Sequence, residues 1–169
     1  FNYGLDFLMR SIQGANFPFV NANIIKGTTL GSDPRKDPTL IEPYRIVEKD
    51  IVDGAGNRHT IKIGFIGFVP PQIMIWDSAN LEGKVTTRDI VQTAAAFVPQ
   101  MKEEGADIIV ALSHSGISMD NSEGAENASL FLADVPGIDV VFTGHQHLVF
   151  PNSSDFADIE GADLEKGTL

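Results

Sequence analysis

The chain has 169 residues and no cysteine, so it contains neither disulfides nor thiolate metal ligands. Hydrophobic residues make up 43% and charged residues 21%, which is typical of a single globular domain with a core of its own. The net charge of −11 argues against a nucleic-acid polymer as a partner, because proteins that bind polyanions carry a basic face.

The first third of the chain predicts a helix, a short strand and a long loop. Apolar residues recur at helical spacing over residues 5–12, and Gly14 is placed to end this helix. Asn2 lies just before the helix, where we expect it to act as the N-cap. The run "FPFVNANII", residues 17–25, predicts a strand, and residues 26–43 are rich in Gly, Pro, Asp and Thr, which indicates a surface loop.

The middle of the chain predicts a β-hairpin. Residues 44–52 and 59–69 are rich in strand-forming residues and flank the turn sequence "DGAGNR". From Ile63 onward the second run is apolar at both alternating positions, as expected for a central strand covered on both faces. The isoleucines and the tryptophan of residues 73–76 follow two prolines, and we expect them in the core or in an interface.

The second half predicts helix, strand, helix and strand. Residues 86–89, "TTRD", resemble a capping box and open a helix that runs to about Glu104, with Pro99 as a point of kinking or interruption. The remaining elements are the strand of "ADIIVALSHSG" (106–116), the helix of "GAENASLFLADV" (124–135) and the strand of "GIDVVFTGHQH" (137–147).

This alternation of strands and helices predicts an α/β fold. Strands joined by helices form right-handed crossovers, so we expect a largely parallel sheet covered on both faces. No internal repeat and no linker divides the sequence, which therefore predicts one domain.

Three of the four histidines lie directly after predicted strands: His114, His145 and His147. Open α/β sheets bind ligands beyond the carboxyl ends of their strands, and neutral imidazole is a common metal ligand. Gly116 and Gly144 would let the backbone turn sharply beside these histidines. We therefore predict a metal site from these three residues. The fourth, His59, lies beside the hairpin turn and is predicted to be a surface residue.

Competing chemistries have less support. Ser113, His114 and Ser115 are adjacent, but neighbouring side chains of an extended chain point in opposite directions, which disfavours a nucleophilic triad. The sequence has no G-x-S-x-G elbow, no Walker loop and no G-x-G-x-x-G motif. Asn21 and Asn23 are predicted to have a structural role in a turn rather than to contact a substrate.

Three motifs carry a resemblance to a known family. "FNYGLDFL" at the start, "ALSHSGI" at 111–117 and "FTGHQH" at 142–147 resemble the calcineurin-like metallophosphoesterase superfamily. Within it they are most similar to the 2′,3′-cyclic-nucleotide 2′-phosphodiesterase/3′-nucleotidase branch of the 5′-nucleotidase family. The similarity extends over most of the chain.

The resemblance implies a four-layered α/β sandwich with two divalent metal ions, Zn²⁺, Mn²⁺ or similar, at the strand ends. His114 and His145 would bind the second ion and His147 the first. Asn2 falls where some members carry an aspartate that orients the catalytic histidine, which gives it a possible orienting role beside that of an N-cap.

The family's G-N-H-E box directly precedes the "F-[DN]-Y-G" sequence, and this chain begins at Phe1. The resemblance therefore implies that residues 1–169 are a single partial catalytic domain, without the N-terminal metal motifs and the C-terminal nucleotide-binding domain. We expect the chain by itself to be inactive and to bind one ion weakly or none, because a stable zinc site normally has about four ligands.

For the parent protein the resemblance implies metal-dependent hydrolysis of nucleotide phosphoesters in nucleotide catabolism, in the periplasm or cell envelope of a bacterium. The alternatives are a 5′-nucleotidase or sugar-nucleotide hydrolase, and a non-catalytic α/β module with an incomplete metal site. The expected partner is a small nucleotide. No apolar run approaches the ~20 residues of a membrane helix, so no membrane span is expected. Missing upstream strands would expose a sheet edge, through which the chain could self-associate.

Overall fold

A computed structural model describes residues 1–151 and 154–160. In chain order the elements are α1 (Leu5–Gln13), β1 (Ile24–Lys26), the 3₁₀ helix η1 (Pro34–Lys36), β2 (Tyr44–Val52), β3 (Arg58–Phe68), α2 (Ile73–Trp76), α3 (Ser78–Leu81), β4 (Val85–Thr87), α4 (Ile90–Glu103), β5 (Ile108–Ser113), α5 (Ser129–Ala133) and β6 (Val140–Phe142).

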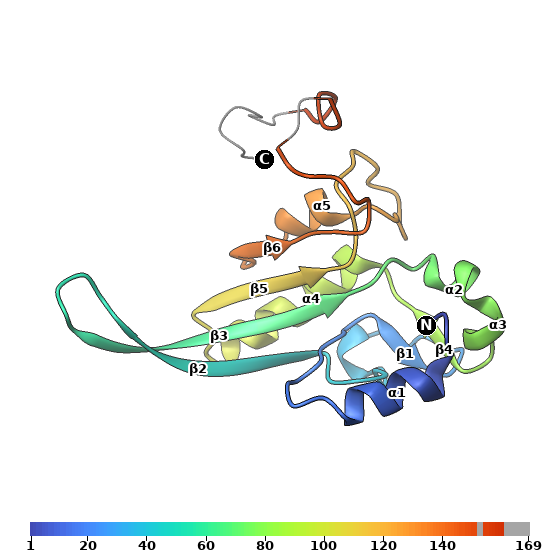
Figure 1. The fold of residues 1–169 in the computed structure, drawn as a ribbon, viewed down its shortest axis with the longest axis horizontal. Coiled ribbons are helices and arrows are strands. Elements are labelled where there is room, and N and C mark those ends of the chain that lie inside the picture. The colour runs from blue at the N-terminus through green and yellow to red at the C-terminus, as the bar shows by residue number, and fades with distance from the viewer. Residues whose placement is uncertain (152–153, 161–169) are drawn as a thin grey trace.

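Four strands form the main sheet, in the order β2-β3-β5-β6 (Figure 1). β2 and β3 are the predicted antiparallel hairpin, and β3, β5 and β6 run parallel. β1 and β4 pair separately as a two-stranded antiparallel ribbon. The α/β fold predicted from the sequence is confirmed, with the difference that its sheets are mixed.

Both long connections of the parallel strands cross the same face of the main sheet. The core on this face unites Ile66 and Ile109 of the sheet with Phe97 of α4 and Leu132 of α5. The strands are added in one direction, from β3 to β5 to β6, and right-handed crossovers then place both connecting helices, α4 and α5, on one side. At Gly67 of β3 the chain at Val20 packs against the other face, but no helix of the described residues does so over β5 and β6, where the prediction of a doubly covered sheet is wrong.

The other face of the sheet carries apolar side chains that no helix of the described chain covers. Leu112 of β5 is 38% exposed, and Val140 and Phe142 of β6 are 41% and 62% exposed. Leu112 lies between the buried Ala111 and Ser113, and Val140 and Phe142 flank the partly buried Val141, as the period of two requires. We refer to Leu112, Val140 and Phe142 as the uncovered face.

The N-terminal region differs from its prediction in two places. The α1 helix and its end at Gly14 are confirmed, but the N-cap is Gly4, and no side chain caps the helix; the expectation that Asn2 would do so is wrong. Of the predicted strand, residues 17–25, only Ile24 and Ile25 lie in a sheet, as part of β1. Before it, the Asn21 side chain accepts hydrogen bonds from the amides of Asn23 and Ile24, which bends the backbone into a turn.

The buried Asn23 has the structural role predicted for it. Its Nδ2 donates to the carbonyls of Val69 and Arg88 at 2.8 Å and 3.0 Å, and its Oδ1 accepts from the Val69 amide at 3.1 Å. Asn23 thus joins the end of β3 to the residue that follows β4. This contact fixes the entrance to the segment that leads into α2.

The two later helices also depart from their predicted limits. Asp89 caps α4 by accepting a hydrogen bond from the Gln92 amide at 2.7 Å, in place of the predicted threonine cap, because Val85–Thr87 forms β4. The helix continues through Pro99 to Glu103. α5 comprises only Ser129–Ala133, since the preceding residues are held in loops by side-chain contacts described below. None of the helices in the described ranges is long and apolar enough to cross a membrane.

Candidate metal centre

The parallel pairing of β5 and β6 brings two of the predicted histidines together. His114 follows the last residue of β5, and His145 lies in the loop after β6. Their ring centres are 5.2 Å apart, with the ring planes at 62°. Two imidazoles that share one tetrahedral ion, with each nitrogen about 2.0–2.1 Å from it, have ring centres roughly 5 Å apart. The spacing of this pair fits one shared ion.

His147 lies close enough to act on the same group. Burial lowers the pKa of His114 below its ordinary value, and the neighbouring imidazoles of His145 and His147 lower that pKa further. His147 is exposed, whereas the His145 side chain is 18% exposed. Among residues 1–151 and 154–160, no group of three or more His, Asp or Glu residues is arranged to hold a metal ion. The described residues therefore contain no complete metal site.

The backbone turn of the GHQH loop, residues 144–147, is made by its histidines. His145 and His147 have φ values of 72° and 58°, in the left-handed region that non-glycine residues seldom occupy. Gly144 and Gly116 are not among the residues with positive φ, so the expectation that they make the turns is wrong. Sparsely populated conformations of this kind persist where the surroundings hold them in place.

Gly116 has a different use, which is to leave room for Gln146. A Cβ atom built on Gly116 would lie 2.2 Å from Gln146 Oε1, and that oxygen accepts a hydrogen bond from the Ile117 amide at 2.8 Å. The side chain between the two histidines of the GHQH loop thus packs against the backbone that follows His114. This contact locks the two histidine loops together.

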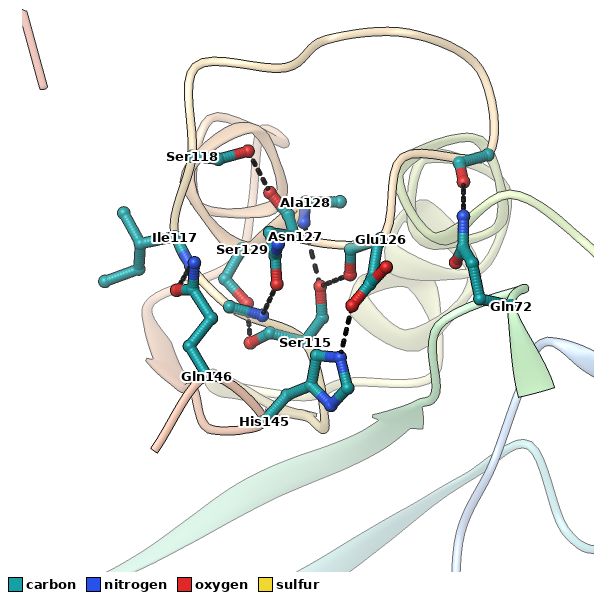
Figure 2. Close-up of polar contacts among 12 residues, drawn as sticks. Gln72, Ser115, Ile117, Ser118, Glu126, Asn127, Ala128, Ser129, His145 and Gln146 are labelled. Atoms are coloured by element: carbon teal, nitrogen blue, oxygen red, sulfur yellow. Dashed lines mark hydrogen bonds and ion pairs between the residues drawn. The ribbon is translucent and has the colours of Figure 1, made fainter. Parts of the chain in front are cut away.

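Ser115 is the second link between these loops, and it is fully buried. Its carbonyl oxygen accepts from Thr143 Oγ1 at 2.6 Å and from Ser129 Oγ at 2.8 Å. Its hydroxyl donates to the Glu126 carbonyl at 2.7 Å and accepts from the Ala128 amide at 2.8 Å, as Figure 2 shows. One serine therefore ties the loop after β5 to the loop after β6 and to the segment before α5.

That segment brings a carboxylate to His145. Oε1 of Glu126 lies 2.8 Å from Nε2 of His145 (Figure 2), and the indole of Trp76 stacks on the same imidazole, with ring centres 5.3 Å apart at 28°. Sequence reasoning missed both residues. Glu126 fell in a predicted helix, and Trp76, predicted to lie in the core or an interface, is 51% exposed. No spacing in the sequence signals either contact.

The two remaining candidates lie outside this cluster. His59 is the second residue of β3 and precedes the part of that strand that pairs with β5; its Nε2 is 2.9 Å from Asp53 Oδ2 within the projecting hairpin (Figure 1). Asn2 is exposed, and its backbone carbonyl accepts a hydrogen bond from Asn80 Nδ2 at 3.4 Å. The structure thus brings His114 and His145 together and keeps His59 away, as predicted.

The fold and the sequence of this chain are those of a known family. Residues 31–149 match the calcineurin-like phosphoesterase family, and the chain belongs to this family. It is 55% identical to a 2′,3′-cyclic-nucleotide 2′-phosphodiesterase/3′-nucleotidase from Salmonella typhimurium and 53% identical to one from Haemophilus influenzae. Each alignment covers 100% of this chain and 25% of the relative, so the chain spans about a quarter of the length of these curated relatives.

Solved structures agree with this relationship. The calcineurin-like phosphoesterase YfkN from Bacillus subtilis superposes with a TM-score of 0.89 at 49% identity, over 100% of this chain and 48% of that one. A putative 5′-nucleotidase from Staphylococcus aureus superposes with a TM-score of 0.63 at 27% identity, over 86% of this chain and 27% of that one.

Proposed function

We propose that this chain is part of the catalytic domain of an enzyme that hydrolyses nucleotide phosphoesters with two divalent metal ions. The observation that carries the proposal is the His114–His145 pair, whose 5.2 Å ring separation at the carboxyl ends of parallel strands suits one shared ion. The relatives from Salmonella typhimurium and Haemophilus influenzae, named as 2′,3′-cyclic-nucleotide 2′-phosphodiesterase/3′-nucleotidases, support that substrate class.

In this proposal each histidine has a defined role. His114 and His145 hold one ion and His147 holds the other, since close metal pairs lie only about 3.5–4 Å apart. The ions, when bound, supply Lewis acidity that activates water and neutralises phosphoryl oxygens. The chain's own contribution is to fix the three imidazoles through the locked loops after β5 and β6. Asn2, at the start of the chain, is proposed to orient the catalytic histidine of an upstream motif.

The 169 residues form one partial domain in this proposal, and further segments complete the centre and bind the base. The uncovered face is where such a segment would pack. In the isolated chain, β6 instead presents an exposed sheet edge, through which we expect self-association. Sedimentation velocity should show association that Phe142→Thr weakens, whereas Ile75→Thr, at an even more exposed apolar position on α2, leaves it unchanged.

The second candidate activity is that of a 5′-nucleotidase or sugar-nucleotide hydrolase. It is supported by the 27% identity to the 5′-nucleotidase of Vibrio vulnificus and by the Staphylococcus aureus structure. The third is a non-catalytic module that keeps the histidines. The higher identity to the cyclic phosphodiesterases favours hydrolysis of 2′,3′-cyclic nucleotides and 3′-nucleotides over these two candidates.

The bacterial relatives favour a periplasmic or cell-envelope location for the parent protein.

A substrate panel on the full-length parent separates these activities. The metal-depleted enzyme is reconstituted with Zn²⁺ or Mn²⁺ and assayed on a 2′,3′-cyclic nucleotide, a 3′-nucleotide, a 5′-nucleotide and a sugar nucleotide. Metal-dependent turnover of the first two is the expected result. Preference for either of the last two supports the second candidate, and no turnover with any metal supports the third.

A further inference from the structure

Glu126 engages one specific nitrogen of His145. Its Oε1 lies 2.8 Å from Nε2 of the imidazole, which is mostly buried. An ionised carboxylate can only accept hydrogen bonds, so Nε2 must carry the proton of this contact. The neutral ring then has its lone pair on Nδ1. The contact thus selects one tautomer of His145 and leaves Nδ1 as the nitrogen that can bind a metal ion.

The backbone around Glu126 is fixed to the loop that carries His114. The Glu126 carbonyl accepts from the Ser115 hydroxyl, and the next two residues bond the same loop: Asn127 Oδ1 accepts from the Gly116 amide at 3.2 Å, and the Ala128 amide donates to Ser115 Oγ (Figure 2). The carboxylate is therefore held from a rigid platform. Its position relative to His145 follows from the same network that sets His114.

Trp76 constrains the orientation of the plane of the His145 ring. The indole stacks on the His145 imidazole at 28° between planes, so it restricts rotation of the ring out of its plane. Trp76 ends α2, whose Ile73 is buried and anchors the helix. His145 is consequently fixed at its backbone by the loop, at its edge by Glu126 and at its face by Trp76.

We propose that Glu126 and Trp76 are positioning residues that hold His145 with Nδ1 free for a metal ion. This inference rests on the proposed function, because it matters only where His145 is a ligand. Metal-binding histidines commonly donate their second ring N–H to a carboxylate, which fixes the tautomer and orients the ring. Neither the family motifs nor the relatives' names give Glu126 or Trp76 a role.

The test uses three substitutions of Glu126: two that separate the reach of the side chain from its charge, and Glu126→Ala, which removes both. In the full-length parent, Glu126→Gln keeps the reach of the side chain and an acceptor oxygen but loses the charge. Glu126→Asp keeps the charge but is one methylene too short. Glu123→Gln and Glu123→Asp, at an exposed position of the same loop, are the matched controls. Affinity for Zn²⁺ is measured by competition with a chelating dye, with thermal unfolding to confirm that each variant is folded.

We expect Glu126→Asp and Glu126→Ala to weaken Zn²⁺ binding by about 10–100-fold, as loss of an outer-shell partner typically does. Glu126→Gln should bind more tightly than Glu126→Asp, and both Glu123 variants should match the wild type. Trp76→Leu should weaken binding, and Trp76→Phe, which keeps a stacking ring, should restore it.

Two results would overturn the inference: wild-type affinity in Glu126→Ala, or tighter binding by Glu126→Asp than by Glu126→Gln. The variant His145→Ala separates this inference from the proposed function. If His145→Ala retains wild-type Zn²⁺ affinity, the proposed centre itself is wrong. If it loses an ion that Glu126→Ala keeps with full affinity, only the positioning role is wrong.

Discussion

At the scale of single residues, substitution of either histidine of the GHQH loop should lower turnover, whereas substitution of His59 should not. In the full-length parent, His145→Ala and His147→Ala each remove a proposed ligand. Turnover should therefore fall by more than the roughly 10–100-fold that loss of an outer-shell contact costs. His59→Ala removes an exposed contact within the hairpin and should leave kcat nearly unchanged. The measurement is kcat at saturating metal; wild-type kcat in His145→Ala contradicts the two-metal proposal.

Gly116 is expected to tolerate no side chain. Gly116→Ala places a methyl group against Gln146 and should displace that side chain from the Ile117 amide, at a cost of about 1–3 kcal/mol from overpacking. Gly144→Ala, in the neighbouring loop, meets no atom within 4 Å and should change stability by less than about 0.5 kcal/mol. Urea denaturation of the 169-residue chain compares the two. Equal stability of both variants would show that the packing of Gln146 against the loop after β5 does not depend on Gly116.

The sequence predicted the position of a residue correctly where that residue directly follows a recognisable strand. His114 and His145 met because each follows a buried strand, which period and composition reveal. Glu126 could not be predicted, because its contact depends on the path of an irregular segment set by Ser115. Asn2 failed as a cap for a local reason: the chain turns at Gly4, whose φ of 83° only glycine adopts readily.

At the scale of elements, Asp139 holds β5 and β6 in register. Its Oδ2 accepts from the Ile109 amide at 2.7 Å and from Lys102 Nζ at 3.1 Å. Asp139→Ala leaves the buried amide of Ile109 without this acceptor and should cost about 1–3 kcal/mol. Asp139→Asn keeps an acceptor oxygen and should cost less. Denaturation of both variants at neutral pH measures the difference.

The same aspartate should make stability depend on acid. The Ile109 amide and then Lys102 lower the pKa of Asp139 below its ordinary value of 3.8. A depressed folded pKa means that the unfolded state binds the proton first, so the stabilisation is present above the ordinary value and is lost as pH falls through the lowered one. The stability of Asp139→Asn should therefore fall less steeply than that of the wild type from about pH 5 to pH 2. Parallel curves would contradict this.

The elements themselves were predicted unevenly. The hairpin and the two later strands were found because β-branched and apolar runs bounded by turn residues have few alternative structures. Residues 17–23 and 124–128 were given regular structure and have little. There, Asn21 makes a local turn through its side chain. Asn23 and Ser115 satisfy backbone groups through contacts that no local pattern encodes. The placement of both helices on one face depends on strand order, which the sequence leaves open.

At the scale of the whole molecule, the isolated chain is expected to be catalytically inactive and to bind metal weakly. It offers a histidine pair and His147 but, within the described residues, no complete group of ligands. Two close dications repel strongly without anionic ligands between them. Calorimetric titration with Zn²⁺ or Mn²⁺ should show at most one weakly bound ion, and a chromogenic phosphodiester should not be turned over. Tight binding of two ions with sustained turnover would show that the chain's own carboxylates complete the centre.

The left-handed backbone of His145 and His147 also bears on how the loop could change in evolution. Glycine or asparagine would occupy those two positions with less conformational strain, and a strained residue of this kind costs about 1–3 kcal/mol. If the proposed catalytic role were lost, a descendant would therefore gain folding free energy by replacing these two histidines. In the two-metal proposal, ligand chemistry, and not the fold, keeps histidine at these two positions.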